Sequence, residues 1–185
     1  PSTEDLQREY LGWSDIDAFY RARGRPRRDM TIRPEFDEAT VRALRPHGAR
    51  VAAYAGYMSV ASPVLTGAHL GVNVHPADLS IEVGGRRRYV GDHAVRDAIV
   101  AGEKAIASST HIVENEVDGG RILMISEPVE VHVPPGADLG DRSTLMAVEA
   151  ENQEQLKRRG DWVIFPRTLL YIAQGRYSVG ERGRL

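Results

Sequence analysis

An asparagine and a histidine stand two residues apart in a short segment, Asn-Val-His-Pro, at positions 73–76. Side chains with this spacing point to the same side of an extended chain, so Asn73 and His75 can face one reacting centre. A side-chain amide can donate a hydrogen bond to an oxygen that becomes negative. A protonated imidazole can stabilise that oxygen or exchange protons with an attacking amine. The pair therefore suits a reaction that passes through a tetrahedral centre.

A carboxylate further along the chain is the third candidate. Asp118 lies in an acidic loop, residues 114–120, and precedes two glycines. A carboxylate beside an imidazole raises its proton affinity. Each residue also has a purely structural alternative, since His75 could be a hydrogen-bonded structural residue, and Asn73 and Asp118 could each fix a turn. The spacing permits a triad and does not by itself establish one.

The remaining histidines do not suggest a metal centre. None of them forms a close His-x-x-x-His pair, and we expect no metal site. His111 is expected to be a packed or partly exposed residue of a short strand. Because the sequence contains no cysteine, it has no disulfide, no thiolate nucleophile and no cysteine-ligated metal.

Strand and helix patterns alternate along the chain and predict an α/β fold. We expect strands at 50–54, 70–74, 110–113 and 121–133, a hairpin flap at 81–90, and helices at 14–24, 34–46, 63–66, 92–102, 145–159 and 161–174, the last two separated by Gly160. Such an alternation is typical of an open, mostly parallel twisted sheet flanked by helices. Open sheets of this kind bind ligands beyond the carboxyl ends of their strands. The strand at 70–74 runs directly into His75, which places the candidate site at such an end.

Length and composition narrow the class of protein. A chain of 185 residues suits one well-buried domain, residues 1–185, and a composition of 42% hydrophobic and 27% charged residues is typical of soluble globular proteins. The net charge of −2 argues against general binding to nucleic acid, and we interpret the arginine clusters at 21–28 and 86–88 as solvated faces. No apolar run approaches the roughly 20 residues that span a bilayer, so we expect a cytoplasmic protein without membrane contact.

Taken in order, the short motifs resemble those of the folate-dependent formyltransferases. The matching segments are Ala-Gly-Tyr-Met at 55–58, Ser-Pro at 62–63, Asn-Val-His-Pro at 73–76, Tyr-Val-Gly-Asp-His at 89–93, Thr-His-Ile-Val at 110–113 and Val-Asp-Gly-Gly at 117–120. Each is short, but their order and placement make the combination specific. The resemblance covers roughly residues 14–177 and is nearest to the glycinamide ribonucleotide, methionyl-tRNA and amino-sugar enzymes. It implies a Rossmann-like fold.

The resemblance also implies an activity and its catalytic residues. The activity is transfer of a formyl group from 10-formyltetrahydrofolate, as co-substrate, to an amine acceptor such as a purine-pathway or sugar amine. The residues that match the family's catalytic positions are Asn73, His75 and Asp118. Two alternatives stay open, namely a hydrolase that gives the formyl group to water and a non-catalytic folate-binding partner subunit.

A folate site is implied by the same resemblance. Its lining would include Met58, Ser59 and Val60 on one side and Val117 on the other. For Met58 and Val60, ordinary core packing is an equal alternative. Arg33 matches an arginine that contacts the glutamate tail of folate, and a guanidinium suits a carboxylate because it donates in a bidentate fork.

The chain departs from the family pattern in two places. The family begins with a strand, a glycine-rich loop that cradles the substrate phosphate, a helix and a second strand, and the sequence lacks matches to them. We expect that this segment was cut, is disordered or is encoded separately, or that the acceptor differs; a homo-oligomer or a partner chain could supply the missing part. The second departure is the flap at 79–88, which is longer and more basic than in the purine enzymes. It is expected to cover a different acceptor or to contact a partner.

Overall fold

The structure is a computed structural model that describes residues 16–177. The described residues divide into two units, one formed by 16–52 with 56–71 and the other by 53–55 with 72–177. We describe each unit by itself, and a single domain over residues 1–185 stays a prediction. The start of the helix expected at 14–24 lies outside the described residues.

The first unit is built from helices that pack through aromatic rings. It contains α2 (Ile16–Ala22), α3 (Arg33–Leu44), the 3-10 helix η1 (Arg45–His47) and α4 (Pro63–Ala68). Phe19 packs edge-on against Tyr20 and Phe36, with ring centroids 5.4 and 5.3 Å apart. Edge-to-face pairs of this kind are each worth about 0.5–1.5 kcal/mol beyond their buried area. The three rings therefore hold α2 against α3.

A four-stranded sheet carries the candidate site. Its strands are β1 (Val51–Ala53), β2 (Leu70–His75), β6 (Ser109–Ile112) and β7 (Ile122–Ile125), in the order β1-β2-β6-β7. Strands β1 and β2 run in the same direction, because the amide of Leu70 bonds to the carbonyl of Arg50 at 3.0 Å and the amide of Tyr54 bonds to the carbonyl of Val72 at 2.8 Å. The α/β class is confirmed.

The other two strand pairs of this sheet are antiparallel, whereas the sequence predicts a mostly parallel sheet. Strand β2 pairs with β6 in the antiparallel sense, and so does β6 with β7. A parallel pair needs a long crossover, whereas antiparallel neighbours can be joined by a short loop. The loop at 113–121 directly joins β6 to β7, so that pair is antiparallel and the sheet as a whole is mixed.

The predicted hairpin flap is present, and along the chain it lies between β2 and β6. It consists of β3 (Glu82–Val83) and β4 (Arg86–Arg87), paired antiparallel. Gly84 and Gly85 connect them with φ values of 62° and 75°. Positive φ at both central residues is what a two-residue type I′ turn requires, and glycine supplies it without steric cost.

The prediction of a single strand at 121–133 is wrong. It is divided into β7 and β8 (Val129–Glu130), which belong to different sheets, since β8 pairs with β5 (Ala105–Ile106). Pro128 lies at the break, and a proline cannot donate to a strand ladder. Apolar residues stand on both sides of the break, so both segments have the composition of strands.

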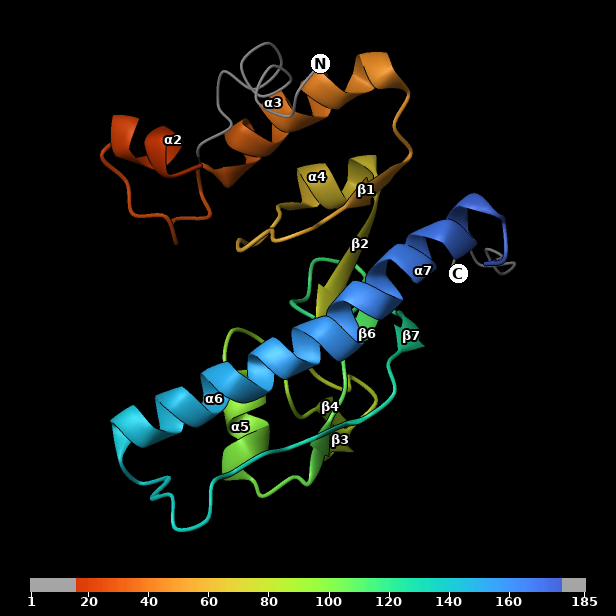
Figure 1. The fold of residues 1–185 in the computed structure, drawn as a ribbon. Helices are drawn as coiled ribbons and strands as arrows, with labels where there is room; N and C mark the ends of the chain where they lie inside the picture. Colours follow the sequence, from red (N-terminus) through yellow and green to blue (C-terminus); the bar gives the residue numbers. More distant parts are fainter. Residues whose placement is uncertain (1–15, 178–185) are drawn as a thin grey trace. The chain divides into compact units, whose positions relative to one another are not determined.

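A continuous helical rod runs along the second unit (Figure 1). It consists of α6 (Arg142–Leu156), the π-helical turn η2 (Lys157–Asp161) and α7 (Trp162–Ala173). The prediction that Gly160 separates two helices is wrong. A Cβ atom at Gly160 would lie 2.3 Å from Oγ of Ser108, so the glycine permits close packing of the rod against the strand segment instead of ending a helix.

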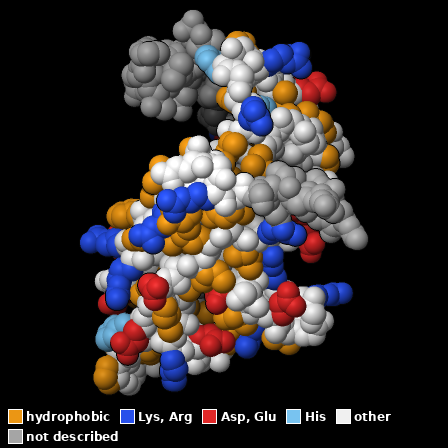
Figure 2. Space-filling model, turned by 90° about the vertical axis from the view of Figure 1, so that its right-hand side faces the viewer, with side chains coloured by type: hydrophobic (Ala, Val, Ile, Leu, Met, Phe, Trp, Pro, Cys, Tyr) orange, Lys and Arg blue, Asp and Glu red, His pale blue; other side chains and the backbone are white. Residues whose placement is uncertain are grey.

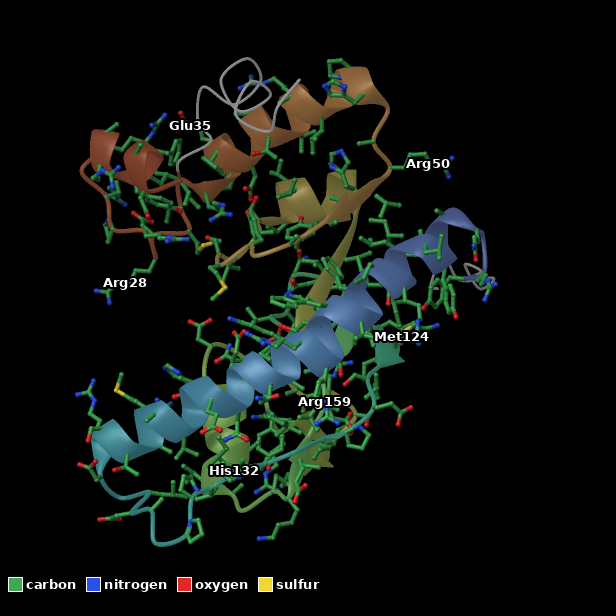
Figure 3. The ribbon with its side chains drawn as sticks, in the orientation of Figure 1. Arg28, Glu35, Arg50, Met124, His132 and Arg159 are labelled. Carbon is green, nitrogen blue, oxygen red and sulfur yellow. The ribbon has the colours of Figure 1, made fainter. Side chains whose placement is uncertain are left out.

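Hydrogen bonds and contacts connect the rod to the sheet and to the chain segment that precedes the rod in sequence. Thr168 of α7 hydrogen-bonds to Thr110 of β6 at 2.8 Å and contacts the sulfur of Met124 at 3.9 Å. Asn152 of α6 accepts from the amide of His132 and donates to its carbonyl, both at 2.8 Å. Figure 3 labels Met124 and His132 on the two segments held in this way. The contacts of Thr168 hold α7 on β6 and β7, and those of Asn152 hold α6 on the segment around His132.

The main hydrophobic core of the second unit lies around α5 (Ala94–Val100). Buried residues of α5 pack with residues of β5, β8 and α6, and the cluster consists of Ala77, Tyr89, Ala94, Val95, Ala98, Ile99, Ile106, Val129, Val148 and Leu156. Charged side chains of both signs are scattered over the face drawn in Figure 2, with hydrophobic side chains between them. Among residues 16–177, no helix has the length and apolar character that crossing a membrane requires.

Replacing Gly160 by alanine should destabilise the protein by about 1–3 kcal/mol, because the added methyl group overpacks a filled contact with Ser108. The same change at Gly67 in α4 is the matched control, since a Cβ atom there meets nothing within 4 Å. A glycine inside a helix usually costs about 0.5–1 kcal/mol relative to alanine, so Gly67→Ala should be neutral or stabilising. Denaturant melts of both variants measure whether each substitution lowers or raises the free energy of unfolding. Equal gains in stability would show that Gly160 is not in a tight contact.

Candidate active site

The register between β2 and β6 gathers polar side chains on one face of the sheet. Asn73 lies opposite His111, and His75 lies opposite Ser109. Directly opposed residues of an antiparallel pair point to the same face, as do residues two apart on one strand. Ser109 also accepts from the amide of Leu79 at 3.0 Å and donates to the carbonyl of Ala77 at 2.8 Å. It thereby fixes the chain that leaves β2 after His75.

The structure brings His75 and Asp118 together, as the sequence predicted. Nδ1 of His75 lies 3.3 Å from Oδ2 of Asp118, and their side chains are 6% and 8% exposed. Asp118 has a left-handed φ of 52°, which is uncommon for a residue other than glycine. The amide of Gly91 donates to the same carboxylate oxygen at 2.8 Å. The carboxylate is thus aimed at the imidazole by the local backbone.

Both ring nitrogens of His75 face oxygen atoms. Nε2 lies 3.0 Å from the carbonyl oxygen of Tyr89, which can only accept, so Nε2 carries a hydrogen in this bond. Nδ1 then presents a lone pair to Asp118 when the ring is neutral and an N–H when it is charged. The space between Nδ1 and Oδ2 is therefore a place where the site can take up a proton.

Burial and charge act in opposite directions on this pair. Burial lowers the pKa of His75, and although Asp118 and the Tyr89 carbonyl oppose it, the pKa lies below its usual value. Burial alone would raise the pKa of Asp118, but His111, His75 and the Gly91 amide outweigh it and the pKa is lowered. At neutral pH the site thus holds an ionised carboxylate and an imidazole that is mostly neutral.

His111 is a second imidazole on the same carboxylate. Its Nε2 lies 3.5 Å from Oδ1 of Asp118, its Nδ1 hydrogen-bonds the carbonyl of Ile112 at 2.8 Å, and the side chain is buried. The sequence predicted a packed or partly exposed residue; the side chain is packed, and the contact with Asp118 was not predicted. Only the strand register, which places His111 opposite Asn73, could have revealed this contact.

Asp161 is a further acidic residue that the sequence analysis did not select. It ends the π-helical turn, and its Oδ1 accepts from Oγ of the buried Ser108 at 2.5 Å. Burial raises its pKa, and Asp161 and His75 act on each other's charge. Single π-helical turns often occur at functional sites. The sequence does not show this turn, because a glycine such as Gly160 is also typical of a helix end.

The other predicted site residues have different surroundings. Asn73 is half-buried on β2. Val117, which precedes Asp118, is 53% exposed, and in the first unit Met58 and Val60 are 73% and 45% exposed. Core packing, the alternative considered for Met58 and Val60, is therefore wrong. These side chains are available for contact with a ligand.

Arg33 does not offer a fork to a ligand carboxylate. Its side chain is completely buried, and Nε donates to Asp37 at 2.9 Å while Nη1 donates to Oγ of Ser59 at 2.6 Å. Nη2 donates to the hydroxyl of Tyr57, and Asp37 in turn accepts from the amide of Ser62 at 2.6 Å. The predicted direct contact with a folate tail is thus contradicted, because every guanidinium nitrogen is used inside the unit. Arg33 holds the segment that contains Ser59.

Removing Arg33 should lower the free energy of unfolding by about 3–5 kcal/mol, because Arg33→Ala leaves the carboxylate of Asp37 buried without its partner. Arg23→Ala is the control, since Arg23 pairs with the exposed Glu35 and its loss should matter far less. Thermal or denaturant melts compare the two. A loss at Arg33 no larger than at Arg23 would show that the buried pair is not needed for the fold.

Comparisons with known proteins show which family the chain resembles. A profile of the formyl transferase family matches residues 16–153. The phosphoribosylglycinamide formyltransferase of Escherichia coli (strain K12) is 26% identical over 151 residues, which are 80% of this chain and 61% of that protein. The crystal structure of glycinamide ribonucleotide transformylase 1 from Symbiobacterium toebii superposes with a TM-score of 0.56 at 26% identity, covering 80% of this chain and 60% of that one. A formyltetrahydrofolate deformylase from Pseudomonas syringae pv. tomato shares the fold, with a TM-score of 0.56 at 22% identity over 90% of this chain and 51% of that one.

The chain therefore belongs to the folate-dependent formyl transferase family, and its fold is the Rossmann-like α/β fold of these enzymes. It spans about three fifths of the length of the Escherichia coli relative.

Proposed function

We propose that this chain transfers a formyl group from 10-formyltetrahydrofolate to an amine. The observation that carries the proposal is the buried contact of 3.3 Å between His75 and Asp118, at the end of a sheet strand. Family membership supports the formyl donor. The name of the Escherichia coli relative makes glycinamide ribonucleotide the first acceptor to test, with a sugar amine as the second.

The proposed reaction uses the face of β2 on which Asn73 and His75 lie. The amine nitrogen attacks the formyl carbon, and the carbonyl oxygen becomes negative. Asn73 donates its side-chain amide to this oxygen, a role whose removal typically costs about 100- to 1000-fold in rate. The bond between the formyl carbon and N10 of the folate then breaks as the carbonyl reforms.

The reaction also requires one proton to move from the attacking amine to N10. His75, neutral beside the ionised Asp118, accepts this proton and the carboxylate stabilises the resulting imidazolium. The proton then passes to N10, so that the site ends in the state in which it began. His111 faces the other oxygen of Asp118 and helps to keep that carboxylate ionised.

Exposed apolar side chains are the proposed folate contacts. Met58 and Val60 are exposed in the first unit and offer hydrophobic surface that suits a pterin ring. Val117, exposed in the second unit, is a separate proposed contact. Ser59 is held by Arg33 and keeps this segment in place. Arg33 thus contributes to folate binding through Ser59 and not by direct contact.

The test is to incubate the chain with 10-formyltetrahydrofolate, with and without each amine, and to follow release of tetrahydrofolate. Release that depends on the amine is the expected result. Release without an amine would identify a hydrolase, and folate binding without release would identify a non-catalytic binding subunit. The same samples, analysed by native mass spectrometry, test whether the chain acts as a homo-oligomer or with a partner chain. Cytoplasmic localisation stays a prediction.

A further inference from the structure

The flap and the residues that directly follow it contact the catalytic candidates at three points. The guanidinium of Arg87 on β4 donates from Nη1 to the backbone carbonyl of Asp118. The amide of Gly91 donates to the carboxylate of Asp118 at 2.8 Å, and the carbonyl of Tyr89 lies 3.0 Å from Nε2 of His75. The segment at 86–91 thus holds both the main chain and the side chain of Asp118.

Asp118 needs such support because of its backbone conformation. A left-handed φ costs a residue other than glycine roughly 1–2 kcal/mol. The chain after it is also confined, since a Cβ atom at Gly120 would lie 1.9 Å from the carbonyl oxygen of Ile112. Backbone strain of this size persists only when neighbouring groups hold it. The contact from Arg87 to the strained residue's own carbonyl is suited to this task.

We infer that Arg87 is a positioning residue, which holds the backbone of Asp118 so that its carboxylate stays between His75 and His111. The inference rests on the proposed use of Asp118 in formyl transfer. Arg87 is half-buried and bonds to the backbone carbonyl of Asp118. It therefore holds the main chain that carries the carboxylate and does not form an ion pair with the carboxylate itself. The longer, basic flap of this chain thereby has a function at the active site.

The charged groups around His75 make the test specific. Asp118 faces it from the loop after β6, His111 lies on β6, Asp161 ends the π-helical turn, and Arg87 approaches from the flap. Loss of a positive charge alone would make His75 easier to protonate. Loss of position moves the carboxylate away and makes His75 harder to protonate. The two effects of removing Arg87 therefore have opposite signs.

The experiment is an NMR titration of the imidazole nitrogens of His75 in the ligand-free full chain. An opposite charge at contact distance shifts a pKa by about 1–3 units, so partial displacement of Asp118 in Arg87→Ala should move the midpoint of His75 to lower pH by roughly 0.5–1 unit. Arg87→Lys, which keeps a donor and the charge, should restore most of the midpoint. Arg86→Ala removes an equal charge from the neighbouring exposed position of β4 and should leave the midpoint in place.

An unchanged or raised midpoint in Arg87→Ala, or the same shift in Arg86→Ala, would overturn the inference. If Arg87→Ala fails to fold, Arg87→Met, which keeps an apolar stem of similar length but has no donor, is judged by the same criterion. With an active acceptor, Arg87→Ala should lower kcat by a larger factor than it changes KM for the folate. Absence of turnover in the unsubstituted chain would count against the proposed function, while the titration would still decide the role of Arg87.

Discussion

Replacing His75 by alanine is expected to lower kcat for formyl transfer by about 100- to 10,000-fold, the range typical of a lost general acid or base. The imidazole, which lies 3.3 Å from the ionised Asp118, is the group to which the proposal assigns the proton transfer. Initial rates with 10-formyltetrahydrofolate and the active amine measure the effect. KM for the folate should change less than kcat, because His75 is not among the proposed folate contacts.

Folding must be measured beside the rate, because His75 is buried and bonded to the Tyr89 carbonyl. Leaving that carbonyl unpaired costs about 1–3 kcal/mol, so a lower melting temperature is expected together with a folded protein at assay temperature. His132→Ala is the control, since this histidine is exposed and is held through its backbone. A loss of activity at His75 that only parallels the unfolded fraction would mark it as a structural residue.

The second large effect is expected from Asp118→Asn, which removes the charge and keeps the size of the side chain. Asp118 raises the pKa of His75 against the stronger effect of burial, so its neutralisation lowers that pKa further. Every limb of the pH–rate profile that reports His75 should therefore move to lower pH. The direction does not depend on whether the neutral or the protonated ring is the active form. The rate at the optimum should also fall, since an amide does not stabilise the imidazolium.

A profile of kcat/KM against pH for Asp118→Asn and for the unsubstituted chain tests this prediction. Glu116→Gln is the matched control, because Glu116 lies in the same loop and is exposed. A normal rate with an unshifted profile in Asp118→Asn would remove Asp118 from the mechanism.

The contact between His75 and Asp118 could be predicted from sequence because its signals are local. His75 follows directly from the strand that positions it, and Asp118 lies in a short polar loop before two glycines. The contact of His111 with Asp118 could not be predicted, because it depends on which residue of β6 faces Asn73. A shift of one residue in that register would place His111 on the other face of the sheet.

Two predictions were wrong because tertiary packing, and not the local sequence pattern, determines the role of the residue. Gly160 suggested a helix end, but the rod needs a glycine there to approach Ser108. Arg33 was assigned to a ligand carboxylate, although an internal carboxylate, Asp37, lies four residues away on the same helix. An arginine and an aspartate with this spacing can pair within a helix, and burial of the pair decided the outcome.

The most direct test of the central proposal is the fate of the formyl carbon. With 10-formyltetrahydrofolate labelled with carbon-13 at the formyl group, NMR should show the label in a new N-formyl amine at the rate at which tetrahydrofolate appears. The same spectra recorded with the His75→Ala variant should show the label still on the folate. Label that appears only as free formate, or that leaves the folate equally fast in both proteins, would contradict formyl transfer to an amine through His75.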